Sequence, residues 1–287
     1  MAIVGFSNFS NFLAYPLTAL AGFGLAYYIT RNKYASFLAG LIFSFSYYHV
    51  LMGRGFMSTN HLEFIPLYYL SLLYALDKKT IASIVLSALA LSIAFMCNAY
   101  LAFFCGLFSV FFFLFDKAGF SLKIFLKYYL LTMPILLITN INFFVSQIRV
   151  FNHENFMAIG RNFVAENQTV NILSFFSPSS TNWLYSFYGA GDNFLGYAAL
   201  ALALVGLFVL RQDKRYFLFF FCFCLSILLA SNVPGLFFVN KIYFAIFGMF
   251  RAVSRLNLVT SLFLALMASM VFNHFSRKYL CFSKKEE

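Results

Sequence analysis

The sequence is dominated by long apolar runs that contain no charged residue. Asp, Glu, Lys and Arg are all missing from residues 1–30, 34–53, 80–115, 128–148, 216–240 and 256–276. A membrane-spanning helix needs about 20 mostly apolar residues to cross a hydrocarbon core of about 30 Å. Only 10% of the chain is charged, compared with about 25% in typical soluble proteins. This pattern predicts an integral membrane protein and excludes a soluble enzyme, a disordered chain and a secreted disulfide scaffold.

Hydropathy divides the chain into nine candidate spans, so we expect an all-α bundle of transmembrane helices. The spans are predicted near residues 12–29, 35–52, 60–76, 80–97, 99–115, 125–143, 193–210, 216–231 and 256–273. The run 80–115 is too long for one span, and we divide it at the polar pair Cys97-Asn98. Residues 235–250 are also apolar, but Lys241 lies in their middle. This favours a helix along the membrane surface over a tenth span.

Lysine and arginine collect on alternate connections between the predicted spans. Fourteen of the 20 basic residues fall on one side and six on the other. Because positive charge stays in the cytoplasm, the C-terminus is predicted inside and the N-terminus outside. An outer N-terminus with no preceding span suggests that the chain lacks its N-terminal part. Membrane orientation also explains the net charge of +11, so nucleic acid is not predicted as a partner.

Two long connections are predicted on the outer face of a single integral membrane domain, residues 1–287. They cover about residues 144–192 and 232–255, and the first holds most of the polar side chains. The first outer segment, about 50 residues long, exceeds what a simple connection needs. We therefore expect the function on the outer face of a bacterial or archaeal cell membrane, with membrane lipids as partners.

Several special residues inside the predicted spans are assigned to packing. Ser36, Gly40 and Ser44 are spaced by four residues and predict a close contact between two helices. Pro134 is expected to kink the sixth span, and Pro16 is expected near the outer end of the first. The five cysteines lack the spacing of a metal site. We expect them to pack, and we predict no metal site and no identifiable cofactor.

Arg54, His61 and Glu63 form the first candidate site, just before Pro66 at the outer start of the third span. A carboxylate at this depth is costly and normally faces a partner or a water-filled cavity. Either His61 or Arg54 is a suitable partner. Alternatively, Glu63 only stabilises the positive end of the helix dipole. The sequence leaves both interpretations open.

Arg251 and Arg255 form the second candidate site, at the outer mouth of the last span. Residues four apart share one helix face, and arginine binds phosphate through a planar fork of donors. The pair suits a lipid phosphate or diphosphate, and the alternative is snorkelling to headgroups. Asp192, which precedes another span, is predicted to cap its helix. No known catalytic motif is present, and no catalytic residue is predicted.

Five segments of the chain, in this order, resemble bacterial and archaeal GT-C-type glycosyltransferase-like membrane proteins. They are 39–49 (AGLIFSFSYYH), 60–67 (NHLEFIPL), 172–178 (ILSFFSP), 193–197 (NFLGY) and 250–255 (FRAVSR). The similarity extends over about residues 12–273, and its strength lies in the order of the short motifs. The resemblance implies a multi-span enzyme that takes a sugar from a polyprenyl-phosphate donor and transfers it on the outer face of the cell envelope.

The catalytic acid that this family carries in its first outer loop is missing, since residues 1–11 contain no acid. The resemblance therefore implies a protein that transfers or binds a polyprenyl-phosphate sugar, either as an enzyme or as an inactive fragment. The alternative is a transporter or flippase for a lipid-linked sugar or another amphiphile, which needs polar residues near the bilayer midplane. The spans hold few, chiefly Asn98 and Thr132. An inert assembly subunit is a third reading.

Overall fold

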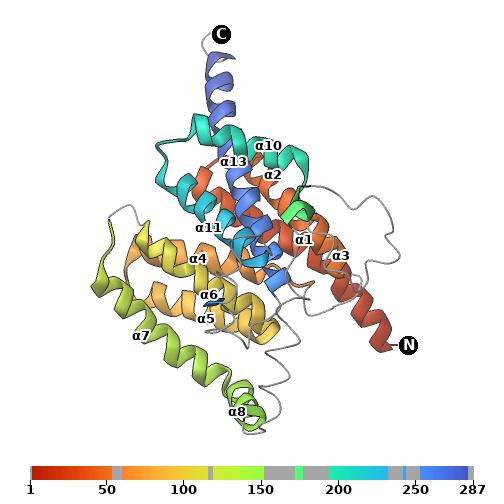
Figure 1. Cartoon of the computed structure of the whole chain (residues 1–287), viewed down its shortest axis with the longest axis vertical. Helices are drawn as coiled ribbons and strands as arrows, with labels where there is room; N and C mark the ends of the chain where they lie inside the picture. The colour runs from red at the N-terminus through yellow and green to blue at the C-terminus, as the bar shows by residue number, and fades with distance from the viewer. Residues whose placement is uncertain are drawn as a thin grey trace.

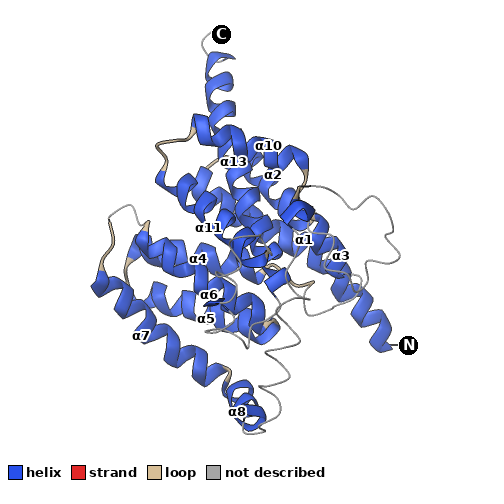
Figure 2. Ribbon diagram, in the orientation of Figure 1, coloured by secondary structure: helices blue, strands red, loops and turns tan. Residues whose placement is uncertain are grey.

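The computed structural model describes residues 2–53, 60–115, 119–151, 172–176, 194–231, 242–243 and 253–283. Within these residues the chain is helical and contains no strand, which confirms the all-α prediction (Figure 2). The helices of the first half are α1 (Ala2–Thr30), α2 (Lys33–Ser44), α3 (Tyr47–Gly53), α4 (Phe64–Lys78), α5 (Ile81–Cys97), α6 (Ala99–Leu114), α7 (Leu122–Thr139) and α8 (Ile141–Phe151). Those of the second half are η2 (Ile172–Phe175), α10 (Tyr197–Val209), α11 (Lys214–Ala230), η3 (Val253–Arg255) and α13 (Leu256–Ser283).

In the part of the chain that the structure describes, three helical segments are long and apolar enough to cross a membrane. They are Phe9–Thr30, Leu122–Thr139 and Val253–Lys278. Shorter apolar helices, among them α5, α6 and α10, pack beside them. These helices support a membrane-embedded protein, as the composition predicts.

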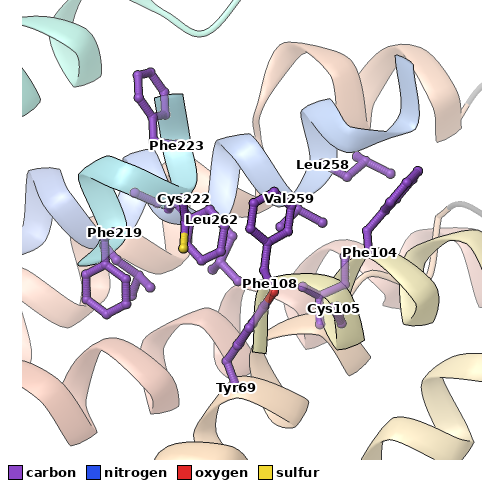
Figure 3. Packing of buried hydrophobic residues seen from close by; sticks show 14 of the residues in the cluster. Tyr69, Phe104, Cys105, Phe108, Phe219, Cys222, Phe223, Leu258, Val259 and Leu262 are labelled. Atoms are coloured by element: carbon purple, nitrogen blue, oxygen red, sulfur yellow. The ribbon is translucent and has the colours of Figure 1, made fainter. Parts of the chain in front are cut away.

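Helix α13 is the centre of the fold, and it packs against α1, α2, α10 and α11 (Figure 1). Its first four turns are almost fully buried, from Leu256 to Val271. Aromatic rings of α4, α6 and α11 gather around Phe263, including Tyr69, Phe108 and Phe219 (Figure 3). Cys105 and Cys222 lie fully buried in the same core as packing residues. This position fits their expected role.

Helices α1 and α2 touch through their backbones, as the stripe of small residues predicts. A Cβ atom placed on Gly40 would lie 2.5 Å from the carbonyl oxygen of Ala19. The Ser44 hydroxyl donates to the carbonyl of Tyr15 at 2.6 Å. Pro16 lies in the interior of α1 and not near its outer end, because the helix already begins at Ala2. Only residues without bulk at these positions permit such a close approach.

The predicted continuous span 35–52 is wrong, because the chain breaks between α2 and α3. Phe45 ends α2, and α3 starts at Tyr47. The ring nitrogen Nδ1 of His49 lies 2.7 Å from the carbonyl oxygen of Ser44. A side chain that occupies this carbonyl competes with the backbone donor that would continue the helix.

The division of the long apolar run at Cys97-Asn98 is confirmed. Helix α5 ends at Cys97, and the Asn98 side chain accepts hydrogen bonds from the backbone N–H groups of Tyr100 and Leu101. Asn98 thus caps the start of α6, and the two helices form a tight hairpin.

The predicted span 125–143 is wrong at its end, because α7 stops at Thr139. Pro134 lies inside α7 without ending it. The Asn140 side chain donates to the carbonyl of Leu136 at 3.1 Å, and the separate helix α8 follows.

Helix α8 presents three different sides. Phe143 and Phe144 pack on Phe95 of α5, with ring centroids 4.9 and 5.4 Å apart. Ile141 and Val145 are exposed on an apolar side, at 57% and 40%. Among residues 141–146 of α8, the exposed polar residues are Asn142 and Ser146.

A buried hydroxyl network holds α7 on the bundle. Tyr128 and Thr132 are the buried residues of α7. The Tyr128 hydroxyl lies 2.8 Å from the Ser87 hydroxyl of α5 and 3.3 Å from the Tyr68 hydroxyl of α4. Each of these groups needs a partner once it is removed from water.

The helix ends that are predicted to face the cytoplasm meet at one end of the bundle. Asp77 at the end of α4 accepts from Tyr28 of α1 at 2.5 Å and pairs with Arg215 of α11 at 3.6 Å. Arg277 of α13 donates to the carbonyl of Thr30 at 3.0 Å. At this end of the bundle α1, α4 and α13 therefore bring their C-terminal parts together with the N-terminal part of α11.

Candidate functional site

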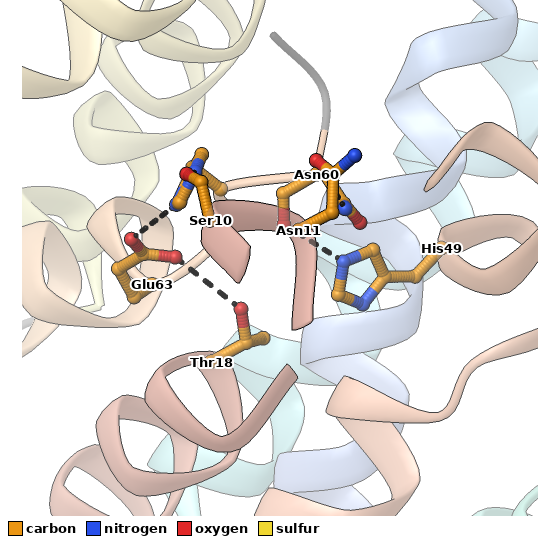
Figure 4. A network of polar contacts seen from close by, with 7 residues as sticks. Ser10, Asn11, Thr18, His49, Asn60 and Glu63 are labelled. Carbon is orange, nitrogen blue, oxygen red and sulfur yellow. Dashed lines mark hydrogen bonds and ion pairs between the residues drawn. The ribbon is translucent and has the colours of Figure 1, made fainter. Parts of the chain in front are cut away.

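The candidate site lies at the opposite end of the bundle, where residues 60–63 lead into α4 beside the first half of α1. Leu62 and Glu63 are buried, and His61 is half-buried. Ser10 and Thr18, two turns apart on α1, face this segment (Figure 4). The segment therefore brings a carboxylate and an imidazole against a helix of membrane length.

His61 and Glu63 contact each other directly, as one of the two predictions for Glu63 requires. The imidazole Nδ1 lies 2.9 Å from Glu63 Oε1. The other carboxylate oxygen accepts a hydrogen bond from the Thr18 hydroxyl at 3.4 Å. Glu63 occupies the N-cap position of α4, but its side chain makes no capping hydrogen bond. Its carboxylate is committed to His61 and Thr18 instead of to the helix end.

The second ring nitrogen of His61 faces a hydroxyl. Its Nε2 lies 2.9 Å from the Ser10 Oγ. A carboxylate only accepts hydrogen bonds, so Glu63 places the ring proton on Nδ1. In the neutral ring, Nε2 then carries the lone pair and accepts a hydrogen bond from the Ser10 hydroxyl. The result is a continuous chain of four groups: Thr18, Glu63, His61 and Ser10.

The side chains of Glu63 and His61 differ in how far they are exposed. The Glu63 side chain is 9% exposed, whereas that of His61 is 29% exposed. The charged group is thus shielded and held by two partners, and the imidazole remains open to a reactant. An imidazole fixed in one tautomer by a carboxylate can act as a general base toward a hydroxyl.

A second group of contacts supports the segment before Glu63. The His49 ring is fully buried, and its Nε2 lies 2.9 Å from the carbonyl oxygen of Asn60. The same ring stacks on Tyr15, with centroids 4.7 Å apart. The Asn60 side chain donates to Asn11 Oδ1 at 3.1 Å (Figure 4). Helix α3 and residue 60 are thereby tied to α1.

Arg255 lies at the same end of the bundle, in the short helix η3. Its guanidinium carbon lies 4.8 Å from the centre of the Tyr100 ring at the start of α6. Arg255 precedes α13 and is half-buried.

Several predicted site residues lie outside the described part of the chain. They are Arg54, Arg251 and Asp192, together with all of the proposed surface helix 235–250 except residues 242 and 243. The N-cap position of α10, for which Asp192 was the expected cap, is held by Gly196. Gly196 has a φ of 86°, a backbone conformation that suits glycine.

Two outer motifs of the sequence meet in the fold. The backbone N–H of Leu195 donates to the carbonyl of Phe175 at 3.2 Å, and Phe175 is fully buried. The segments around residues 172–175 and 194–196 therefore lie side by side before α10 begins.

Sequence reasoning missed Ser10, Thr18 and His49 as members of the site. Ser10 and His61 are 51 residues apart, and no local spacing connects them. Their only sequence signal is a polar side chain in an apolar run. Within the described residues, no group of three or more His, Cys, Asp or Glu side chains is arranged to hold a metal ion. Comparisons with protein-family models, curated proteins and solved structures gave no match to this chain.

Proposed function

We propose that the chain is an integral membrane protein of nine spans, with its candidate site on the outer face and its C-terminus in the cytoplasm. Each predicted span coincides with one or two of the helices from α1 to α13. The polar contacts of Asp77 and Arg277 join the ends that carry most of the basic residues. Positive charge at one end of a bundle favours the cytoplasmic side for that end.

This topology makes a direct prediction for reporter fusions. Green fluorescent protein fused after Lys79 or Lys214 should fluoresce and alkaline phosphatase fused there should be inactive, because both residues lie at the basic end. At Asn167 the opposite is expected, with active alkaline phosphatase and no fluorescence. The measurement is paired alkaline phosphatase and green fluorescent protein activity in cells. Reversed readings at any two of the three positions would contradict the topology and the outer location of the site.

We further propose that the site binds a polyprenyl-phosphate sugar and transfers the sugar to an acceptor hydroxyl. One observation carries this proposal: an imidazole oriented by a buried carboxylate, His61 with Glu63, lies at the same bundle end as the half-buried Arg255. Arginine suits the phosphate of the donor, and the half-buried imidazole suits a hydroxyl that loses a proton. A donor with a lipid tail reaches such a site from the bilayer.

The chemical roles follow from the geometry. An acceptor hydroxyl that replaces the Ser10 hydroxyl at His61 Nε2 gives its proton to the ring as it attacks the sugar carbon. The bond from that carbon to the phosphate oxygen breaks, and Arg255 stabilises the negative charge on the departing polyprenyl phosphate. Glu63 orients the ring and stabilises the imidazolium that forms. The pair His61–Glu63 thus takes the place of the acid that the sequence lacks.

Substitutions at Arg251 and Arg255 test whether these residues bind the donor. Changing Arg251 and Arg255 together to glutamine should weaken binding of a polyprenyl-phosphate sugar by at least about 100-fold, because hydrogen bonds to charged groups contribute about 1.5–3 kcal/mol each and both are lost. Lysine at both positions should restore only part of the affinity, since it lacks the planar fork. Binding is measured in nanodiscs with a fluorescent donor.

Arg211→Gln is the matched control, because this exposed arginine carries the same charge at the opposite end of the bundle. Unchanged binding in the double glutamine variant would contradict the proposal. Movement of the lipid-linked sugar across vesicle membranes without any transfer product would instead favour a flippase.

A further inference from the structure

Ser10, His61 and Glu63 have the atomic arrangement of a nucleophile, a base and the group that orients the base. Ser10 Oγ lies 2.9 Å from His61 Nε2, and His61 Nδ1 lies 2.9 Å from Glu63 Oε1. Both distances fall within the range of good hydrogen bonds. Such a triad is recognised by geometry and roles and not by sequence position.

We propose that Ser10 is an activated nucleophile that takes the acyl group of a carboxylic ester and passes it to water. The proposal is independent of sugar transfer, because it rests on Ser10 and its contacts and assigns no role to Arg255. It goes beyond general-base activation of a foreign hydroxyl, since the hydroxyl that His61 faces in the structure is the protein's own.

The order of exposure along the triad fits this role. Ser10 and His61 are half-buried, so an ester can approach Oγ. Glu63 is buried, and Thr18 holds its second oxygen, so the carboxylate keeps one position. A serine is a weak nucleophile until an adjacent base removes its proton, and His61 is placed to do so.

The substrate class follows from where Ser10 lies. Ser10 lies on the membrane-length helix α1, at the end of the bundle that holds the site. An ester at this level belongs to a lipid whose acyl chain stays in the bilayer. The neighbouring Asn11 accepts from Asn60 through Oδ1. Its amide NH₂ is a donor of the kind that stabilises the oxyanion of an acyl transfer.

The reaction balances without a further reactant except water. The Ser10 proton moves to His61 Nε2 as the bond from Oγ to the carbonyl carbon forms. The bond from that carbon to the ester oxygen breaks, and the imidazolium gives its proton to the leaving alcohol. A water molecule then loses its proton to His61 as it attacks the carbonyl carbon of the acyl-serine. The bond from that carbon to Ser10 Oγ breaks, and the imidazolium returns its proton to Oγ. The products are a carboxylic acid, an alcohol and the free Ser10 hydroxyl.

A fluorophosphonate probe tests the nucleophile directly in the full chain, purified in phospholipid nanodiscs. The serine Oγ displaces fluoride from phosphorus, and mass spectrometry of the digested protein locates the adduct. We expect one adduct, on Ser10, and none in Ser10→Ala. His61→Gln should slow labelling by at least about 100-fold, the usual contribution of a general base. Ser146→Ala, at the exposed serine of α8, is the matched control and should label at the parent rate.

Glu63 is a positioning residue, and its test separates orientation from folding. Glu63→Gln should slow labelling at least about tenfold, because an amide does not fix the imidazole in the productive tautomer. Glu63→Asp should recover part of the rate. Melting temperatures measured on the same samples show whether each variant is folded. Hydrolysis of a p-nitrophenyl ester should follow the same order among the variants.

Labelling of folded protein at other serines but not at Ser10 would overturn the proposal, as would labelling of Ser10 at an unchanged rate in His61→Gln. These results are separable from those for sugar binding. If Ser10 is unreactive while the arginine pair controls donor affinity, only the nucleophile proposal fails. If Ser10 reacts while the arginine variants bind the donor normally, only the sugar proposal fails.

Discussion

Replacing Gly40 by alanine is expected to destabilise the protein by about 1–3 kcal/mol, the usual cost of forcing extra atoms into a packed core. The new Cβ atom would lie 2.5 Å from the carbonyl oxygen of Ala19, and backbone cannot move aside as a flexible side chain can. Helices α1 and α2 would have to separate. Because α2 also packs on α13, the separation would reach the centre of the fold.

Thermal unfolding in detergent measures this effect, and a fall in the melting temperature of roughly 2–10 °C is expected for a chain of this size. Gly106→Ala is the control, because a Cβ atom there meets no other atom within 4 Å and the residue is also inside an apolar helix. Alanine should be neutral or stabilising at that position, since it favours helix more than glycine does. Equal melting temperatures for Gly40→Ala and the parent would show that α1 and α2 are less closely packed than described.

Replacing Tyr128 by alanine is expected to cost about 3–5 kcal/mol, as for other large buried aromatic side chains. The change removes a fully buried ring and leaves the hydroxyls of Ser87 and Tyr68 without this partner. Tyr128→Phe keeps the ring and should cost about 1–3 kcal/mol, the penalty for losing the partner of a buried polar group. Helix α7 should loosen first, because Tyr128 and Thr132 are its buried residues.

The measurement is limited proteolysis combined with thermal unfolding, with Leu130→Ala as the control. Leu130 lies two residues away on the same helix and is 70% exposed. Its truncation should change the melting temperature little. If Leu130→Ala destabilises the protein as much as Tyr128→Ala does, the face of α7 that packs on α5 has been assigned wrongly.

The positions of the helices could be predicted from sequence, but their breaks could not. Hydropathy integrates over about 20 residues, so it finds each apolar helix and identifies Asn98, whose polarity interrupts a long run. The breaks at Phe45 and Asn140 depend on single side-chain contacts with carbonyl groups, from His49 and from Asn140 itself. A window average does not resolve contacts of this kind.

Only part of the candidate site could be predicted from the sequence. Glu63 and His61 are close in the chain, and the cost of burying a carboxylate predicts that it needs a partner. Ser10 and Thr18 reach the same carboxylate and imidazole only because α1 packs against α4. Such pairings are decided by helix packing, which neither charge nor spacing encodes.

The docking of α8 has a mechanical consequence. Its apolar side, Ile141 and Val145, suits hydrocarbon, whereas Asn142 and Ser146 suit water, so the height of α8 follows the surface of a surrounding bilayer. The described contacts of its rings converge on Phe95, in the last turn of α5. We therefore expect lateral pressure or thinning of the bilayer that displaces α8 to act first on that turn, which precedes the cap of α6 at Asn98.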